Sequence, residues 1–351
     1  MSKSHKLRSR KAGLPPGSLV HIGEIKTSEC GVSLIEFDAN GVNESSATPD
    51  LSQPPQRATR WINVYGAHTP SDLSTIARQY ALHPLAQEDI LNTAQRQKID
   101  TYEHYLYLVL HRYELSTAPL RLEQDQISLI VGKDYVISFQ ERPSKTFEPI
   151  RQRLRNEHSS LRRGDAGMLA YSLIDAVVDS YFGVVEQLNE EAETLEADIL
   201  SHPRPSTLEG IHQLKRCVSQ LRRNLHPLRE VLGTLHRDAD DVFRPDIQLY
   251  LRDVYDHTVH ILESLEDLRD LATGLLDVYL STVSHRVNLE VRTLSVVATI
   301  FMPATLIAGI FGMNFQTMPW LDLPQGFVYA LYLMGAIALF MLGLFWRRKL
   351  V

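Results

Sequence analysis

TLSVVATIFMPATLIAGIF (293–311) and GFVYALYLMGAIALFMLGLFW (326–346) are the two stretches that decide the fold. Neither contains a charged side chain, and each is about 20 residues long, the length that a helix needs to cross a bilayer. The mean hydropathy of the chain is only −0.15, because a large polar body dilutes these two spans. The sequence therefore predicts a protein anchored by two transmembrane helices near its C-terminus.

Flanking charges predict the orientation of these spans. Arg286 and Arg292 precede the first span, a basic tail (347–351) follows the second, and the loop 313–325 has no Lys or Arg. Because positive charge stays on the cytoplasmic side, we expect a multi-pass protein of the cell (inner) membrane with both termini in the cytoplasm.

Composition excludes several other classes of protein. The 351 residues carry a net charge of −6, which gives no reason to expect a nucleic-acid partner. The two cysteines have no metal-ligand spacing, and no HExxH, CxxC, GxSxG or GxxxxGKS pattern occurs. We therefore expect neither an enzyme nor an organic cofactor.

Upstream of the spans, the pattern predicts an α+β cytoplasmic domain at 17–165, after a flexible basic tail at 1–16. Late strand-like runs favour antiparallel pairing. The expected strands are Leu19–Ile25, Val32–Phe37, Arg60–Val64, Tyr105–Arg112, Gln126–Val131 and Tyr135–Gln140, and the expected helices are Ser71–Tyr80, Pro84–Asn92 and Ser144–Glu157.

A helical hairpin at 166–245 and a stalk helix at 246–292 are expected next. The end of the first hairpin helix is acidic and the second is basic. This favours a charge-matched pair, with a cation-gathering acidic face as the alternative. In the stalk, apolar or small residues recur every three or four positions from Ile247 to Thr282, which is the seam of a helix packed on other helices. No turn separates this helix from the first span. A single helix from Pro245 to Gly312 is about 100 Å long.

A second, polar stripe follows the same helix into the membrane. Its members are Asp277, Ser281, Ser284, Asn288, Val291, Ser295, Ala298, Met302, Thr305 and Gly309. Small and polar residues can pack membrane helices together, or they can line a water-filled path. Packing does not easily explain Asp277 and Asn288, so we favour a pore lined by the first span (293–312). Leu294 and Met302 are candidate apolar constrictions. Two spans cannot enclose a pore, so this interpretation requires an oligomer.

Phe311-Gly312-Met313-Asn314-Phe315 ends the first span. Gly-Met-Asn at this place, after a long helix and before one last span (326–346), resembles the signature of the CorA magnesium/cobalt transporter family. Further stretches resemble family segments, and the likeness looks greatest to the thermophilic bacterial branch. They include Trp61-Ile62-Asn63, Glu88-Asp89-Ile90-Leu91-Asn92, Ser172-Leu173-Ile174-Asp175-Ala176 and Arg252-Asp253-Val254-Tyr255-Asp256-His257.

The resemblance implies a funnel-shaped homopentamer in membrane lipid that takes up Mg²⁺, also Co²⁺ and possibly Ni²⁺, driven by the membrane potential. Gly312, Met313 and Asn314 would form the outer mouth, where Asn314 amide and Gly312 carbonyl oxygens bind the hydrated ion. Val291, Asn288, Ser284 and Asp277 would line the pore further down, with Thr305 above them.

The resemblance also implies regulatory divalent ions, Mg²⁺ or Co²⁺, between neighbouring subunits. The matching acids are Asp89 and Asp253, with Glu88 and Asp175 nearby. Carboxylates that repel when empty are bridged by a hard dication, so ion loss would loosen the funnel and open the pore.

Three departures and several alternatives stand beside this interpretation. Beyond Gly-Met-Asn only Asp322 is acidic, Val291 replaces a bulkier residue of some relatives, and Met313 differs from the Val typical of zinc transporters. Within transport, the alternative is a Co²⁺- or Zn²⁺-preferring carrier or an exporter. In another class, the alternative is a membrane-anchored coiled-coil sensor, which would not need Asn314.

Overall fold

The computed structural model describes residues 13, 15–45, 49–238, 242–313 and 323–348. The predicted tails (1–16 and 347–351) and loop (313–325) fall partly outside these residues. The helices and strands are β1 (Gly31–Asp38), β2 (Gly41–Ser45), β3 (Thr59–Tyr65), α2 (Pro70–Gln79), α3 (Pro84–Leu91), β4 (Lys98–Thr101), β5 (Leu106–Thr117), β6 (Leu120–Val131), β7 (Tyr135–Gln140), α4 (Glu148–Arg155), α5 (Ala166–Ser201), α6 (Pro205–Asp238), α7 (Pro245–Phe311) and α8 (Gly326–Arg347).

The chain divides into two compact units. One consists of Met1–Ala197 and Ser206–Gly274, and the other of Asp198–Pro205 and Leu275–Val351. Helix α7 begins in the first unit and ends in the second.

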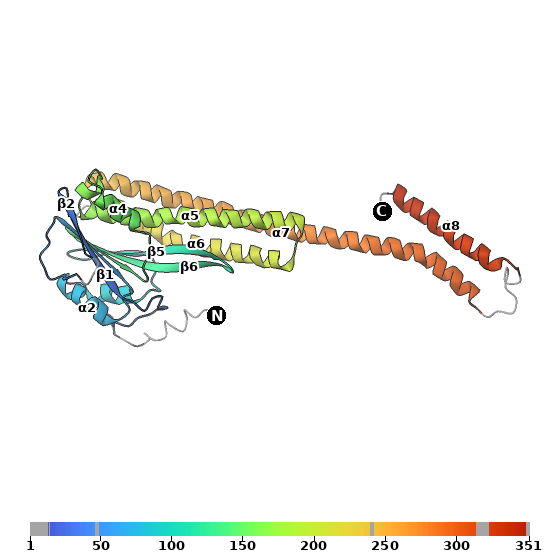
Figure 1. Ribbon diagram of the computed structural model, residues 1–351, viewed down its shortest axis with the longest axis horizontal. Helices are drawn as coiled ribbons and strands as arrows, with labels where there is room; N and C mark the ends of the chain where they lie inside the picture. Colours follow the sequence, from blue (N-terminus) through green and yellow to red (C-terminus); the bar gives the residue numbers. More distant parts are fainter. Residues whose placement is uncertain (1–12, 14, 46–48, 239–241, 314–322, 349–351) are drawn as a thin grey trace. The chain divides into compact units, whose positions relative to one another are not determined.

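A seven-stranded mixed sheet forms the centre of the first unit (Figure 1). Its strand order is β2-β1-β3-β7-β6-β5-β4. Strands β5, β6 and β7 pair antiparallel, as the late cluster of strands predicts, and the one parallel pair joins β3 to β7. The chain crosses from β3 to β7 through α2, α3 and the β4–β6 meander, which leaves room for that parallel pairing.

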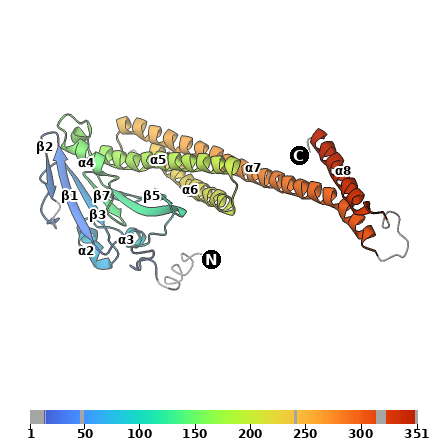
Figure 2. The same cartoon turned by 45° about the vertical axis from the view of Figure 1, so that its right-hand side comes forward.

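Helices cover both faces of the sheet, so the central strands are buried on both sides (Figure 2). On one face, α2 and α3 pack their apolar side chains against Ile62, Val64 and Tyr107. On the other face, Trp61 meets the ring of Phe147 edge-on, at 6.0 Å between ring centroids. Alternation along β3 sends Trp61 and Ile62 to opposite layers, each with 1% exposure or less.

One predicted strand is absent, and two strands of the sheet were not predicted. Leu19–Ile25 is not a strand: only Ile22 forms a bridge, to Asn92 just after α3. The segment pairs with neither edge strand, β2 or β4, and its Ile22 lies beside the end of α3 instead. Strands β2 (GVNES) and β4 (KIDT) were not predicted, because they are short and polar and depend on pairing with β1 and β5.

The stalk helix begins and ends where the sequence predicts. α7 runs from Pro245 to Phe311, and Gly312 follows it directly. Every seam residue from Ile247 to Tyr279 is buried, with at most 8% exposure. Even the polar member, Thr258, is fully buried, and its hydroxyl donates to the Val254 carbonyl at 3.0 Å. The seam prediction is therefore confirmed over about nine turns of helix, up to Tyr279, whereas its last predicted member, Thr282, is half-buried.

The predicted charge matching between α5 and α6 is wrong. Glu186, Glu190 and Glu196 of α5 are exposed, and no ion pair within the described ranges joins the α5 acids to α6. Arg222 of α6 instead pairs with Glu266 of α7 at 2.6 Å. The apolar faces determine how these helices pack. The exposed charged side chains contribute little to that packing and pair with whichever opposite charge lies within reach.

Among the residues that the structure describes, three helices are long and apolar enough to cross a membrane. In α5 the apolar window is 56% buried, because this helix packs on the sheet and on its neighbours. In α7 and α8 the corresponding windows are only 6% buried. Two helices therefore expose surfaces that need lipid or other protein around them, and these are the two spans that the sequence predicts.

Arg60 and Glu36 form an ion pair inside the first unit, at 2.7 Å with both side chains at most 5% exposed. We predict that Arg60→Met destabilises the full chain by about 3–5 kcal/mol, because Glu36 would remain buried and unpaired. Arg57→Met is the matched control: its partner Asp38 lies at 2.9 Å, but both side chains are over 20% exposed, so the loss is about 1 kcal/mol. Thermal unfolding in detergent measures both, and equal losses would contradict the prediction.

Candidate metal centre

The four acids predicted to bind regulatory ions lie on three helices. Glu88 and Asp89 belong to α3, Asp175 to α5 and Asp253 to α7. Within the described residues, the structure brings Asp175 and Asp253 into one neighbourhood. No described interaction of the chain joins this pair to Glu88 or Asp89.

Asp89 is a buried carboxylate with a cationic partner. It is 7% exposed, and its Oδ2 accepts a hydrogen bond from Lys98 Nζ at 2.7 Å. The Gln95 side-chain amide donates to its other oxygen. Lys98 also pairs with Asp100 at 2.6 Å. A dication at Asp89 must therefore compete with Lys98, which can turn to Asp100.

Glu88 ties the N-terminal segment to α3. It is 9% exposed and accepts a hydrogen bond from the backbone N–H of Gly17. Gly17 has a φ of +82°, a conformation that favours glycine, and a Cβ there would lie 3.1 Å from Pro84 Cβ. This close approach holds the segment around Gly17 against the start of α3, next to Glu88.

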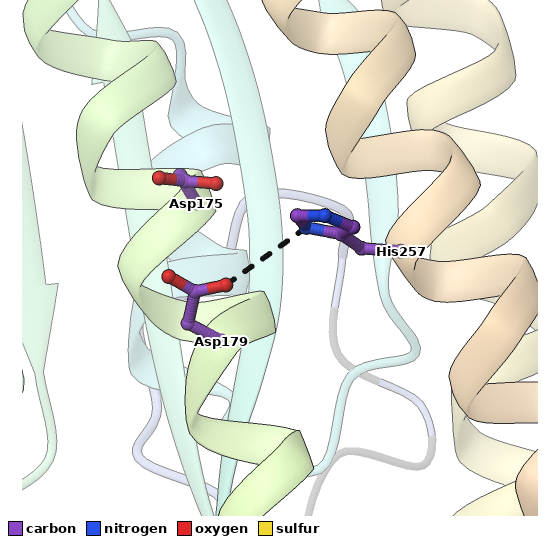
Figure 3. Close-up of side chains that lie close together, drawn as sticks. All are labelled: Asp175, Asp179 and His257. Carbon is purple, nitrogen blue, oxygen red and sulfur yellow. Dashed lines mark ion pairs between the residues drawn. The ribbon is translucent and has the colours of Figure 1, made fainter.

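Asp175, Asp179 and His257 form a cluster between α5 and α7 (Figure 3). One ligand atom from each lies within 4.8 Å of the others, and no other such group of three occurs among the residues that the structure describes. His257 Nδ1 lies 3.9 Å from Asp179 Oδ1, and His257 Nε2 lies 3.7 Å from Asp253 Oδ2. The cluster therefore offers three carboxylates and one imidazole.

Helix geometry brings these four side chains together. Asp175 and Asp179 are four residues apart on α5, as are Asp253 and His257 on α7, so each pair projects from one face of its helix. The Phe182 and His257 rings meet edge-on between the same helices, with 5.7 Å between their centroids. The predicted set lacked Asp179 and His257, although this four-residue spacing in the sequence could have indicated both.

Burial and crowded charge make the cluster costly without a cation. The pKa of Asp175 is raised to about 6, by burial first and then by the charge of Asp179, against the opposing effect of His257. The pKa of Tyr171 is raised by burial and by the charges of Asp175 and Asp253. Either a proton or a metal ion relieves this repulsion between carboxylates. A dication relieves more of it, because it carries two positive charges.

The predicted pore residues lie in the second unit. Those in the described part are exposed in the single chain; they are Asp277, Ser284, Asn288, Val291, Leu294, Met302, Thr305, Gly312 and Met313. Asn314 lies outside the described residues. Leu294 is 70% exposed and Met302 69%, which is far more than a folded chain leaves open for large apolar groups without another surface to cover them.

A shallow groove of about 630 Å³ runs along the same face of α7. It is lined by Ala298, Phe301, Met302, Thr305, Leu306, Gly309, Ile310 and Met313. At its end the helix closes normally: the Gly312 N–H donates to the Ala308 carbonyl at 2.9 Å, and the Met313 N–H to that of Ile310 at 3.2 Å. The Thr305 hydroxyl donates to Phe301 O, one turn back along the same helix, at 2.9 Å.

Comparisons with known proteins agree with this arrangement. The family model for CorA-like Mg²⁺ transporter proteins matches residues 56–349. The cobalt/magnesium transport protein CorA of Thermotoga maritima is 40% identical over 97% of this chain and 98% of its own length. The divalent cation transporter CmaX of Pseudomonas aeruginosa is 29% identical over 64% of this chain and 68% of its own length.

A solved structure shares the fold. The complete CorA magnesium transporter of Methanocaldococcus jannaschii superimposes with a TM-score of 0.75, at 19% identity, over 90% of this chain and 97% of that one. The mixed sheet, the long helix α7 and the exposed apolar surfaces of α7 and α8 are those of a membrane transport protein. The chain belongs to the CorA-like Mg²⁺ transporter family.

The raised pKa of Asp175 predicts a pH-dependent stability. An unfolded aspartate titrates near 3.8 and this one near 6, so its ionisation opposes folding: the cost is absent below pH 3.8, grows up to pH 6 and is complete above it. We predict that metal-free Asp175→Asn unfolds at a higher temperature than wild type above pH 6, and that the difference disappears toward pH 3.8.

The exposed Asp256→Asn on α7 is the matched control and should show no such pH dependence. Added Co²⁺ should narrow the gap above pH 6 by stabilising the wild type. If the two proteins unfold at the same temperature, or differ by the same amount at every pH, the ionisation of Asp175 does not oppose folding.

Proposed function

We propose that the chain is a divalent-cation channel that mediates uptake of Mg²⁺ and Co²⁺ across the cell membrane. The observation that carries this proposal is the polar stripe of α7. Asp277, Ser284, Asn288 and Thr305 recur along one exposed stripe of α7, and Thr305 lies within the charge-free span 293–311. Polar groups at membrane depth face protein or water, and here nothing within one chain covers them.

A pore requires several copies of this face. Because two spans cannot enclose a path, identical chains must surround a common axis with α7 innermost and α8 toward lipid. Family membership supports a homopentamer. The groove along α7, with Met302 and Met313 in its lining, lies on the stripe that would face the common axis.

The lining suits a hydrated dication. Mg²⁺ loses its water reluctantly, and hydroxyl, amide and carboxylate groups can hydrogen-bond its hydration shell. Asn314 and the Gly312 carbonyl are proposed as the outer ring, and Asn288 and Asp277 as rings further along. A membrane potential attracts a dication inward by about 4.6 kcal/mol per 100 mV, so no nucleotide is required.

Cytoplasmic ions provide the proposed regulation. Asp89 of one subunit and Asp253 of its neighbour, with Glu88 and Asp175 nearby, would bind Mg²⁺ or Co²⁺ between subunits. The raised pKa of Asp175 and the 63% exposure of the Asp253 side chain support this role, because the cluster needs positive charge and is open to it. Bound ion would hold the subunits together and close the pore.

The proposed topology places both termini in the cytoplasm. Arg347 and Arg348 at the end of α8, and Arg286 and Arg292 before the first span, support this orientation. A Co²⁺- or Zn²⁺-preferring transporter or exporter shares the same geometry, and competition between ions in the flux assay separates these from Mg²⁺ uptake.

We predict that Asn314→Ala lowers Mg²⁺ flux into proteoliposomes with a negative interior by at least about tenfold. A loss of only 1.4 kcal/mol at the mouth suffices for that change. Magnesium loaded inside the vesicles should reduce the wild-type flux. Asn43→Ala is the control, because this amide contacts Gln56 in the first unit at 2.9 Å and has no role in the pore. Wild-type flux in Asn314→Ala, or no flux in an intact oligomer, would favour the anchored sensor.

A further inference from the structure

Two histidines that no role above uses lie together beside the sheet. His21 precedes the Ile22–Asn92 bridge, and His68 lies between β3 and α2. Their ring centroids are 6.0 Å apart, with an angle of 68° between the ring planes. Neither belongs to the α5–α7 cluster or to the second unit.

Backbone hydrogen bonds fix the position of both histidines. The Ile22 N–H donates to the Leu91 carbonyl at 3.0 Å, and the Thr93 N–H donates to the Ile22 carbonyl at 2.8 Å. These bonds hold His21 at the end of α3. The His68 N–H donates to Asp72 Oδ2 at 3.0 Å, which holds His68 at the start of α2. The backbone positions of both histidines are therefore set by the fold.

Among the described residues, no hydrogen bond of normal geometry reaches the imidazole of His21, although the Leu91 carbonyl acts on it. Both its ring nitrogens are buried, and neither makes a hydrogen bond within the described part of the chain. An unsatisfied buried polar group costs about 1–3 kcal/mol, so its presence points to a missing partner. Burial first, and then the nearby His68, lower the pKa of His21, against the opposing effect of the Leu91 carbonyl. A neutral imidazole offers one nitrogen lone pair to a metal.

The spacing of the two rings fits a shared metal ion. Two imidazoles bound tetrahedrally at about 2.0–2.1 Å place their ring centroids roughly 5–6 Å apart. The carboxylate of Asp72 accepts a hydrogen bond from the His68 backbone N–H, and its negative charge favours a dication nearby. The Leu91 carbonyl is the kind of group that accepts the second N–H of a metal-bound histidine.

We propose that His21 and His68 form a binding site for a first-row transition dication, Co²⁺, Ni²⁺ or Zn²⁺, whose remaining ligands are water. Nitrogen ligands select these ions and disfavour Mg²⁺, which prefers oxygen. The site therefore differs in chemistry from the carboxylate cluster and the polar stripe. It gives the sheet domain a means to distinguish Co²⁺ from Mg²⁺, and it does not depend on the proposed transport.

The test is a Co²⁺ titration of the full chain in detergent, with excess Mg²⁺ present to occupy the oxygen sites. Visible absorption of Co²⁺ and calorimetry report the ligand geometry and the stoichiometry. We expect one Mg²⁺-resistant Co²⁺ per chain in the wild type. His21→Gln and His68→Gln should each weaken its binding by at least about tenfold.

His104→Gln is the matched control, because this histidine has a side chain 75% exposed in the turn between β4 and β5. It should bind Co²⁺ as the wild type does. If His21→Gln fails to fold, His68→Gln carries the same expectation. Undiminished Mg²⁺-resistant binding in the folded histidine variants would overturn the proposal, as would complete displacement of Co²⁺ by Mg²⁺ in the wild type.

Discussion

Polar side chains on an apolar helix must be kept away from hydrocarbon, and the rest of this molecule depends on how α7 meets that requirement. Up to Tyr279 its seam is buried against protein. Further along, Asn288 and Thr305 share a face that one chain leaves bare. Only other chains or water can cover such a face in a membrane. In the proposed channel, assembly, permeation and topology all depend on that single constraint.

Electrostatics gives the first unit a complementary need for cations. Asp89 has Lys98 as a counter-charge, whereas Asp175 lies beside Asp179 and near Asp253 with only His257 and the more distant Arg153 opposing. The first carboxylate is stable without metal, and the second is strained by its neighbours. Ion binding therefore changes the energy of the α5–α7 region far more than that of α3, which makes these helices suitable for sensing.

Patterns that repeat along one helix could be predicted from the sequence: the seam from Ile247, the two spans and the end of α7 before Gly312. Features that depend on tertiary neighbours could not. The 19–25 segment has strand-like residues but forms only the Ile22–Asn92 bridge, and Arg222 pairs with Glu266 and not with the acids of α5. The four-residue spacings could have indicated Asp179 and His257 separately, but that they meet depends on the packing of α5 against α7.

Cysteine scanning of α7 in liposomes tests the central claim most directly. With Cys30 and Cys217 replaced by serine, single cysteines are introduced on the polar stripe and on the opposite face. The stripe set is Val291, Ser295, Met302 and Thr305, and the opposite set is Val297, Ile300, Ala304 and Ile307. The account predicts that a membrane-impermeant thiol reagent modifies the first set and spares the second. Equal modification of both sets, or protection of the stripe, would contradict a water-filled path along α7.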